Sequence, residues 1–232
     1  AGFLGLCFFA GLGVFLRLRG KPVRALIGIG LALLLAEILI CRSRGGTLGF
    51  VLGLALFLAL SLQAPRESER DSGRLATIAT VSGIALAATL LATLALRRNS
   101  WQGLFTATTD KLELFAGAAR LIGDHAWLGV GRGAFGSVFP AYQSSGAHAV
   151  YEHAENFTLQ WAAEWGLPAA LLALALFARA LLTLCTRPFL QRSTRRAALV
   201  GVVVLLAQNQ VDLGLELPAV SALLACVLGA LF

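Results

Sequence analysis

The chain has 232 residues, of which 58% are hydrophobic and only 13% are charged, and its mean hydropathy is +0.79. Soluble globular domains carry about 25% charged residues, so this composition excludes the soluble class and predicts an integral membrane protein. The net charge of +7 would also suit a nucleic-acid-binding protein, but the basic residues lie in the loops between apolar runs, and no nucleic acid partner is expected.

Seven apolar runs can be placed as membrane spans, each approaching the roughly 20 residues that a helix needs to cross the hydrocarbon core. Lipid offers no partner for backbone polar groups, so each run is expected to be a helix, and the alternation typical of barrel strands is missing. The predicted fold class is therefore all-α, a polytopic transmembrane helical bundle. A chain without Met that starts inside an apolar run is also expected to be part of a longer protein. The runs are 1–16, 23–41, 45–62, 75–96, 157–185, 197–211 and 217–232.

The basic residues predict how this bundle is oriented. If successive loops alternate sides, most of the basic residues fall on one side, in the loops 17–24, 66–74 and 187–196. The positive-inside rule places that side in the cytoplasm and the long segment 97–155 outside. The predicted organisation is one membrane domain. It consists of N-terminal spans in 1–96, an extracytoplasmic loop in 97–155 and C-terminal spans in 156–232.

The long loop contains one amphipathic segment, residues 110–124. Its apolar side chains recur at the i, i+3, i+4 spacing of a helix. We expect a helix on the outer membrane surface, with Lys111 and Arg120 at its two ends. All four tryptophans lie in this loop or just after it, which is typical of an aromatic belt at one membrane interface. The apolar positions are Leu112, Leu114, Phe115, Ala118, Leu121 and Ile122.

A glycine-rich motif, GVGRGAF, follows at Gly129–Phe135. A nucleotide-binding loop would need a strand before it and a correctly spaced helix after it, and the sequence has neither. The motif instead predicts a tight turn in which glycines allow close backbone approach and Arg132 projects from the middle. A solvated arginine and a functional one are both compatible with this pattern.

A polar stripe marks the start of the run 157–185. Asn156, Gln160 and Glu164 recur at i, i+4 and i+8, so they share one helix face, and His153 and Glu155 precede them. Intramembrane polar groups of this kind indicate a polar cavity at the outer leaflet, although a solvated helix end is the alternative. The run is long for one span and contains Pro168, which predicts a tilted or kinked helix. Residues 208–216 form a second polar group on the same side, typical of a solvated loop.

In this order the amphipathic helix, the GVGxGxF turn, Phe-Pro-x-Tyr, His-x-x-Asn-x-x-Leu-Gln and Glu-x-Gly-Leu-Pro resemble the O-antigen ligase and polysaccharide polymerase superfamily. The resemblance covers residues 110–172 closely and implies an active site in the extracytoplasmic loop. It implies transfer of a glycan from undecaprenyl diphosphate to a hydroxyl of lipid A core, another glycan or a protein. The expected location is the bacterial cytoplasmic membrane, with the loop on its outer face.

The resemblance also implies site residues. The family commonly has His, the proposed base, directly before the Asn, where this sequence has Glu155, and it has Arg where this sequence has Lys111. We therefore expect Glu155 and His153 to act as the catalytic base pair. The expected substrate-binding residues are Lys111, Arg120 and Arg132 for the diphosphate, together with Asn156 and Gln160. No cofactor and no metal are expected, because a diphosphate leaves as a stable anion and the sequence has no convincing metal cluster.

Two other function classes fit parts of the sequence. A transporter of a small anion such as inorganic carbon would bind its substrate near the bilayer midplane, on broken helices within repeated halves. The sequence shows no repeat, and its polar residues gather at one face of the membrane. The departures at Lys111 and Glu155 also suit a non-catalytic scaffold for glycan assembly.

Overall fold

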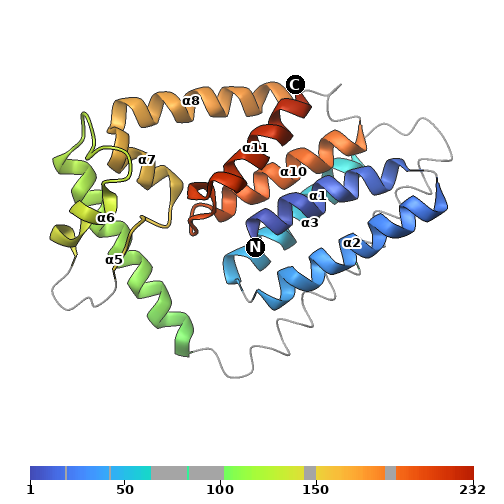
Figure 1. The fold of residues 1–232 in the computed structure, drawn as a ribbon, viewed down its shortest axis with the longest axis horizontal. Helices are drawn as coiled ribbons and strands as arrows, with labels where there is room; N and C mark the ends of the chain where they lie inside the picture. Colours follow the sequence, from blue (N-terminus) through green and yellow to red (C-terminus); the bar gives the residue numbers. More distant parts are fainter. Residues whose placement is uncertain (19, 42, 64–82, 84–101, 144–149, 186–191) are drawn as a thin grey trace. The chain divides into compact units, whose positions relative to one another are not determined.

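The computed structural model describes residues 1–18, 20–41, 43–63, 83, 102–143, 150–185 and 192–232, without the side chains of 44 and 102–110. In these ranges the regular elements are helices, which confirms the all-α class (Figure 1). The predicted run 75–96 and Trp101 lie outside the described residues. The chain divides into two compact units. Unit 1 is Ala1–Leu96, Leu182–Gln208 and Pro218–Phe232, and unit 2 is Arg97–Leu181 and Asn209–Leu217.

Three helices in the described ranges have the length and hydropathy of membrane spans. They are α2 (Lys21–Ile40), residues Gly45–Leu62 of α3 (Arg44–Leu62), and α8 (Leu167–Leu184). Helices α1 (Gly2–Arg17) and α11 (Pro218–Leu231) are apolar but shorter. Helix α10 (Ser193–Gln208) starts within the basic loop and ends before the predicted boundary at 211. The chain is thus a multi-span membrane protein.

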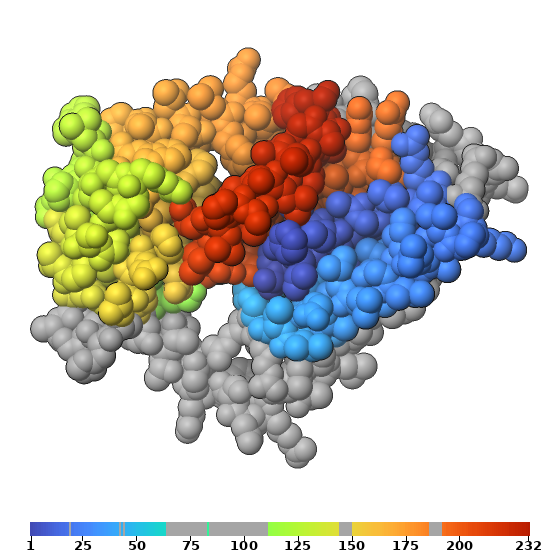
Figure 2. Space-filling model, viewed as in Figure 1, coloured from blue at the N-terminus to red at the C-terminus, as the bar shows by residue number. Residues whose placement is uncertain are grey.

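Unit 1 is a helical bundle in which α1 packs mainly against α10 and also against α2 and α3. Figure 2 shows α2 lying along α1. Its core contains four phenylalanines in mutual ring contact: Phe8, Phe9, Phe50 and Phe57. At Gly13 an added Cβ would lie 2.9 Å from the Thr194 Cα, so the α1 and α10 backbones approach closely there. Small residues at such crossings are typical of membrane helix packing.

Unit 2 is built around α5 (Gln102–Asp124), which begins well before the predicted residue 110, so Lys111 lies within the helix and not at its end. The apolar face of α5 packs against η1 (Phe139–Tyr142) and α7 (Phe157–Trp165), next to α6 (Phe135–Val138). Leu114, Ala118 and Leu121 are buried in this core, whereas Leu112 is 62% exposed. Protein therefore covers most of the predicted amphipathic face. Its position relative to a membrane stays a prediction.

The predicted run 157–185 is two helices, because the chain breaks at Gly166 between α7 and α8. Gly166 has φ +79°, and a Cβ there would collide with the Trp127 carbonyl. The prediction of one tilted or kinked span was wrong. Pro168 lies in the first turn of α8, where a missing N–H breaks no helical hydrogen bond. The backbone conformation of Gly166, and not Pro168, separates the two helices.

Gly166→Ala is expected to lower the free energy of unfolding. A non-glycine residue at positive φ costs about 1–3 kcal/mol, and the Cβ would add a clash with Trp127. The matched control is Gly123→Ala, because Gly123 lies on α5 in the same unit with open space around it. Thermal unfolding in detergent would measure both variants. Equal melting temperatures for the two variants would contradict the prediction.

Candidate functional site

The GVGRGAF motif forms the predicted tight turn. Its glycines have positive φ, at 67° for Gly129, 96° for Gly131 and 78° for Gly133. The Val130 N–H donates to the Ala163 carbonyl at 2.9 Å, and the Gly131 N–H donates to the Glu164 carbonyl at 3.0 Å. A Cβ on Gly129 would collide with the Glu164 backbone, which explains the glycine there. The turn is thereby fixed against the C-terminal end of α7.

Arg132 projects from this turn and joins two buried carboxylates. Its guanidinium donates to Glu164 Oε2 at 2.9 Å and to Glu216 Oε2 at 2.8 Å. The side chains of Glu164 and Glu216 are only 1% and 7% exposed, whereas that of Arg132 is 56% exposed. Burial lowers the pKa of Arg132, but the charges and hydrogen bonds of Glu216 and Glu164 outweigh it and raise that pKa. Glu164 and Glu216 were not among the predicted site residues.

The stripe on α7 is a buried hydrogen-bonded chain. Gln160 Oε1 accepts from the Ala154 N–H at 2.7 Å, and Gln160 Nε2 donates to Glu164 Oε1 at 2.8 Å. The i, i+4 contact between Gln160 and Glu164 confirms that they share a helix face. The α7 face that carries Gln160 and Glu164 packs inside unit 2. It belongs to a short helix and not to the membrane-length helix α8. Gln160 therefore connects the 153–155 segment to Glu164 and, through it, to Arg132.

Asn156 caps α7 and connects it to the segment that follows α10. Its Oδ1 accepts from the backbone N–H groups of Thr158 and Leu159, both at 3.0 Å. Its Nδ2 donates to the Gln210 carbonyl at 2.9 Å. The segment 209–217, which includes η2 (Gly214–Glu216), belongs to unit 2, and Asn209 is buried. The interpretation of this segment as a solvated loop was wrong, because its polar groups bond within the unit.

Lys111 and Glu155 form an ion pair with a distance of 2.7 Å between Nζ and Oε2. Lys111 Nζ also donates to the Val211 carbonyl at 2.6 Å. Among the described residues other than glycine, Glu155 alone has positive φ, at 48°. This conformation is uncommon for a residue with a Cβ, and such outliers concentrate at functional sites. The structure thus brings together a predicted base and a predicted substrate-binding cation.

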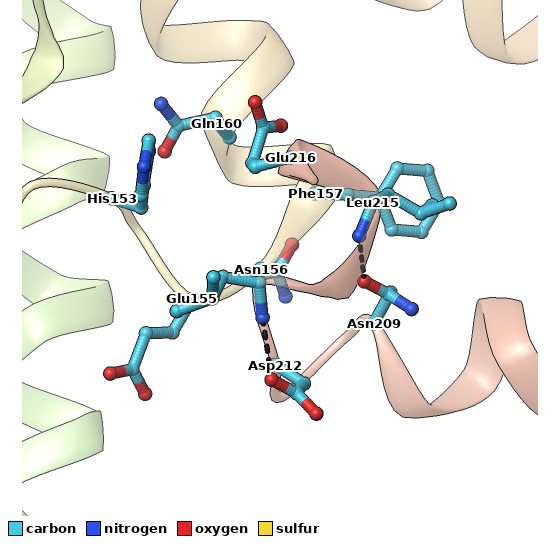
Figure 3. Close-up of a pocket in the computed structure, with 10 residues that line it drawn as sticks. His153, Glu155, Asn156, Phe157, Gln160, Asn209, Asp212, Leu215 and Glu216 are labelled. Atoms are coloured by element: carbon cyan, nitrogen blue, oxygen red, sulfur yellow. Dashed lines mark hydrogen bonds between the residues drawn. The ribbon is translucent and has the colours of Figure 1, made fainter. Parts of the chain in front are cut away.

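A shallow, tightly packed depression lies beside this ion pair. His153 Nδ1 is buried, with no hydrogen-bond partner in the described ranges. In Figure 3 the side chains of His153, Gln160 and Glu216 point to one side of the 153–157 segment, and that of Glu155 points to the other. The two predicted catalytic side chains therefore diverge. The lining residues are His153, Glu155, Asn156, Phe157, Gln160, Asn209, Asp212, Leu213, Leu215 and Glu216.

Arg120 does not line this depression. Its guanidinium donates to the Tyr142 carbonyl at 2.9 Å, near the end of α5. The Tyr142 hydroxyl donates to Asp124 at 2.9 Å, and this hydrogen bond raises the pKa of Tyr142. Of the three predicted substrate-binding cations, the structure places Lys111 and Arg132 against carboxylates that line the depression, and it places Arg120 against η1.

The sequence matches one family model, described as O-antigen ligase (Wzy_C), over residues 29–175. The matched range includes α5, the Arg132 turn, the Glu155 segment and α7. Comparison with curated proteins and with solved structures gave no match. Membership of this family implies transfer of a lipid-linked glycan. The chain belongs to the O-antigen ligase family.

Proposed function

We propose that this protein transfers a glycan from undecaprenyl diphosphate to an acceptor hydroxyl at the outer face of the bacterial cytoplasmic membrane, as an O-antigen ligase or a polysaccharide polymerase. The observation that carries the proposal is the Lys111–Glu155 ion pair at the edge of a depression that His153 also lines. The proposal keeps the predicted organisation, with spans in 1–96 and 156–232, seven spans in all, and residues 97–155 outside.

The donor diphosphate binds Lys111 in this proposal. Its oxygens compete with the Glu155 carboxylate for Nζ, because both are anions that accept charge-assisted hydrogen bonds. Donor binding therefore releases Glu155 from its partner at 2.7 Å. The ammonium group then faces the charge that develops on the leaving diphosphate, which is where electrostatic stabilisation accelerates transfer most.

The released Glu155 carboxylate takes the proton of the acceptor hydroxyl, with His153 as the second candidate base. The hydroxyl oxygen forms a bond to C1 of the donor sugar, and the bond from C1 to the diphosphate oxygen breaks. The electron pair of that bond leaves with undecaprenyl diphosphate. The positive φ of Glu155 supports this role, because such strain persists only where the surroundings fix it.

Three other predicted site residues hold the elements around Glu155 and His153 in place. Asn156 holds α7 against the segment 209–217, and Gln160 holds the Ala154 backbone next to the proposed bases. Arg132 fixes the carboxylates of Glu164 and Glu216. We propose that these three residues position the walls of this depression, and we assign no substrate contact to Arg120.

Lys111→Ala is expected to lower kcat/KM for the donor about 10- to 100-fold, the value of a hydrogen bond to a charged group. Lys111→Arg should retain most of the activity, because it keeps the charge. The measurement is transfer from purified undecaprenyl-diphosphate-linked glycan in vesicles. Lys21→Ala is the matched control, because Lys21 is an exposed lysine in unit 1. Wild-type kcat/KM in Lys111→Ala would refute the role of Lys111.

A further inference from the structure

We propose that the turn after α5, residues 125–128, inserts the side chains of Trp127 and Leu128 into the lipid at one membrane interface and so holds unit 2 at a fixed depth. Trp127 is 81% exposed and Leu128 is 86% exposed. Single exposed apolar side chains are common on protein surfaces, but contiguous large ones mark contacts with a partner or a membrane. Membrane contact of this kind does not depend on the proposed transferase activity.

The backbone of this turn is fixed to the start of α8. The Ala126 carbonyl accepts a hydrogen bond at 2.7 Å from the N–H of Leu167, the first residue of α8. The Trp127 carbonyl lies so close to Gly166 that a Cβ there would collide with it. All of these residues belong to unit 2. The turn therefore lies beside the first residue of α8, whatever the arrangement of the rest of the chain.

Helix α8 in turn relates the turn to the membrane. It has the length and hydropathy of a span, and only 11% of its residues are buried within the protein. Its 18 residues make a helix about 27 Å long, which is close to the roughly 30 Å of the hydrocarbon core. The first residue of a span of this length lies near one interface, and the turn beside it lies at the same interface. The exposed leucines that face lipid in such a span include Leu171, Leu172 and Leu176.

The surroundings of the turn favour lipid over water or a protein partner. Residues 125–131 and 165–178 contain no Asp, Glu, Lys or Arg, so no charge in these segments keeps the turn in water. Trp127 and Leu128 together offer a few hundred Å² of apolar surface, whereas a stable protein interface buries about 1,000 Å² or more. Tryptophan also prefers the membrane interface, because its ring is apolar and its N–H can reach water.

The other tryptophans in the described ranges, Trp161 and Trp165, have protein partners. Their rings stack with centroids 4.8 Å apart, and the Phe157 ring contacts that of Trp161. The Arg132 guanidinium lies 6.0 Å from the centre of the Trp165 ring. Both indole side chains are only partly exposed. Of these three tryptophans, Trp127 is therefore the one whose ring is free to enter lipid.

The depth of Trp127 is measured by fluorescence quenching of the protein in phosphatidylcholine vesicles. The difference in emission between the wild type and Trp127→Phe isolates the Trp127 signal. Lipid brominated near the head group should quench this signal about twofold more than lipid brominated near the end of the acyl chain, because an interfacial side chain lies about 5–10 Å deep. Stronger quenching by the deep label, or quenching by aqueous acrylamide alone, would overturn the proposal. Quenching by neither reagent would overturn it in favour of a protein cover, such as a second copy of this chain.

A charge placed in the turn tests the same contact with the reporter in place. Leu128→Glu should lower the lipid quenching of the Trp127 signal at least twofold, because a carboxylate draws the turn toward water. The matched control is Val150→Glu, because Val150 is an apolar residue of unit 2 that is 83% exposed and lies outside the turn. Each variant is compared with its own Trp127→Phe double variant, and melting temperatures in detergent verify that it is folded. Unchanged quenching in folded Leu128→Glu, or an equal loss in Val150→Glu, would overturn the proposal.

Discussion

Glu155→Gln is expected to reduce the rate of glycan transfer at least 100-fold, because general base catalysis contributes about 10²–10⁴-fold. The amide keeps the shape of the side chain but cannot take the acceptor proton. The ion pair with Lys111 is exposed in part, so its loss should change the melting temperature little. The measurement is the initial rate at saturating donor and acceptor, so that binding defects do not contribute.

Three further variants test the assignment of the base. Glu155→His should keep appreciable activity, because it places before the asparagine the histidine base that the resemblance to the family implies there. Complete loss in a stably folded protein would count against this equivalence. If Glu155→Ala and His153→Ala both transferred glycan at the wild-type rate, the assignment of the base to this segment would be wrong.

Arg132→Ala is expected to cause the largest loss of stability among the site variants. It leaves the buried carboxylates of Glu164 and Glu216 without their shared cation. Removal of one partner of a buried pair costs about 3–5 kcal/mol, and the 56% exposure of Arg132 puts the expected loss of unfolding free energy near the lower end. Thermal or denaturant unfolding in detergent would measure it.

The controls for Arg132 use the same cluster. Arg120→Ala removes one exposed hydrogen bond to a carbonyl, so it should cost about 1 kcal/mol. The double variant Arg132→Ala/Glu164→Gln should recover part of the stability that Arg132→Ala loses, because one unpaired charge is removed. Equal unfolding free energies for Arg132→Ala and Arg120→Ala would show that the carboxylates do not depend on Arg132.

Features that depend on local sequence could be predicted well. The apolar runs 23–41 and 45–62 gave helices close to the expected bounds, because a helix in lipid must satisfy its own backbone. The GVGRGAF motif forms the tight turn that was predicted, and the structure shows that its glycines have positive φ. The i, i+4 relation of Gln160 and Glu164 likewise appears as a direct hydrogen bond.

Features that depend on distant contacts could not be predicted. At Gly166, where the helix breaks, the Trp127 carbonyl lies too close for a Cβ. The predicted apolar run 157–185 continues across this position, so hydropathy alone gives no sign of the break. Glu216 lies 84 positions from Arg132 in the sequence, and no periodicity connects them. A polar segment such as 209–217 has the same composition whether it is solvated or buried. Its placement in unit 2 is a matter of tertiary packing.

The most direct test of the transferase proposal is the stoichiometry of transfer by the purified protein in vesicles. Radiolabelled glycan on undecaprenyl diphosphate is supplied with an acceptor glycan, and both the linked product and the released lipid diphosphate are quantified. The proposal predicts one released undecaprenyl diphosphate for each glycan transferred, and loss of both products in Glu155→Gln. Uptake of labelled bicarbonate without release of lipid diphosphate would contradict it in favour of a transporter, and inactivity in both assays would favour a scaffold.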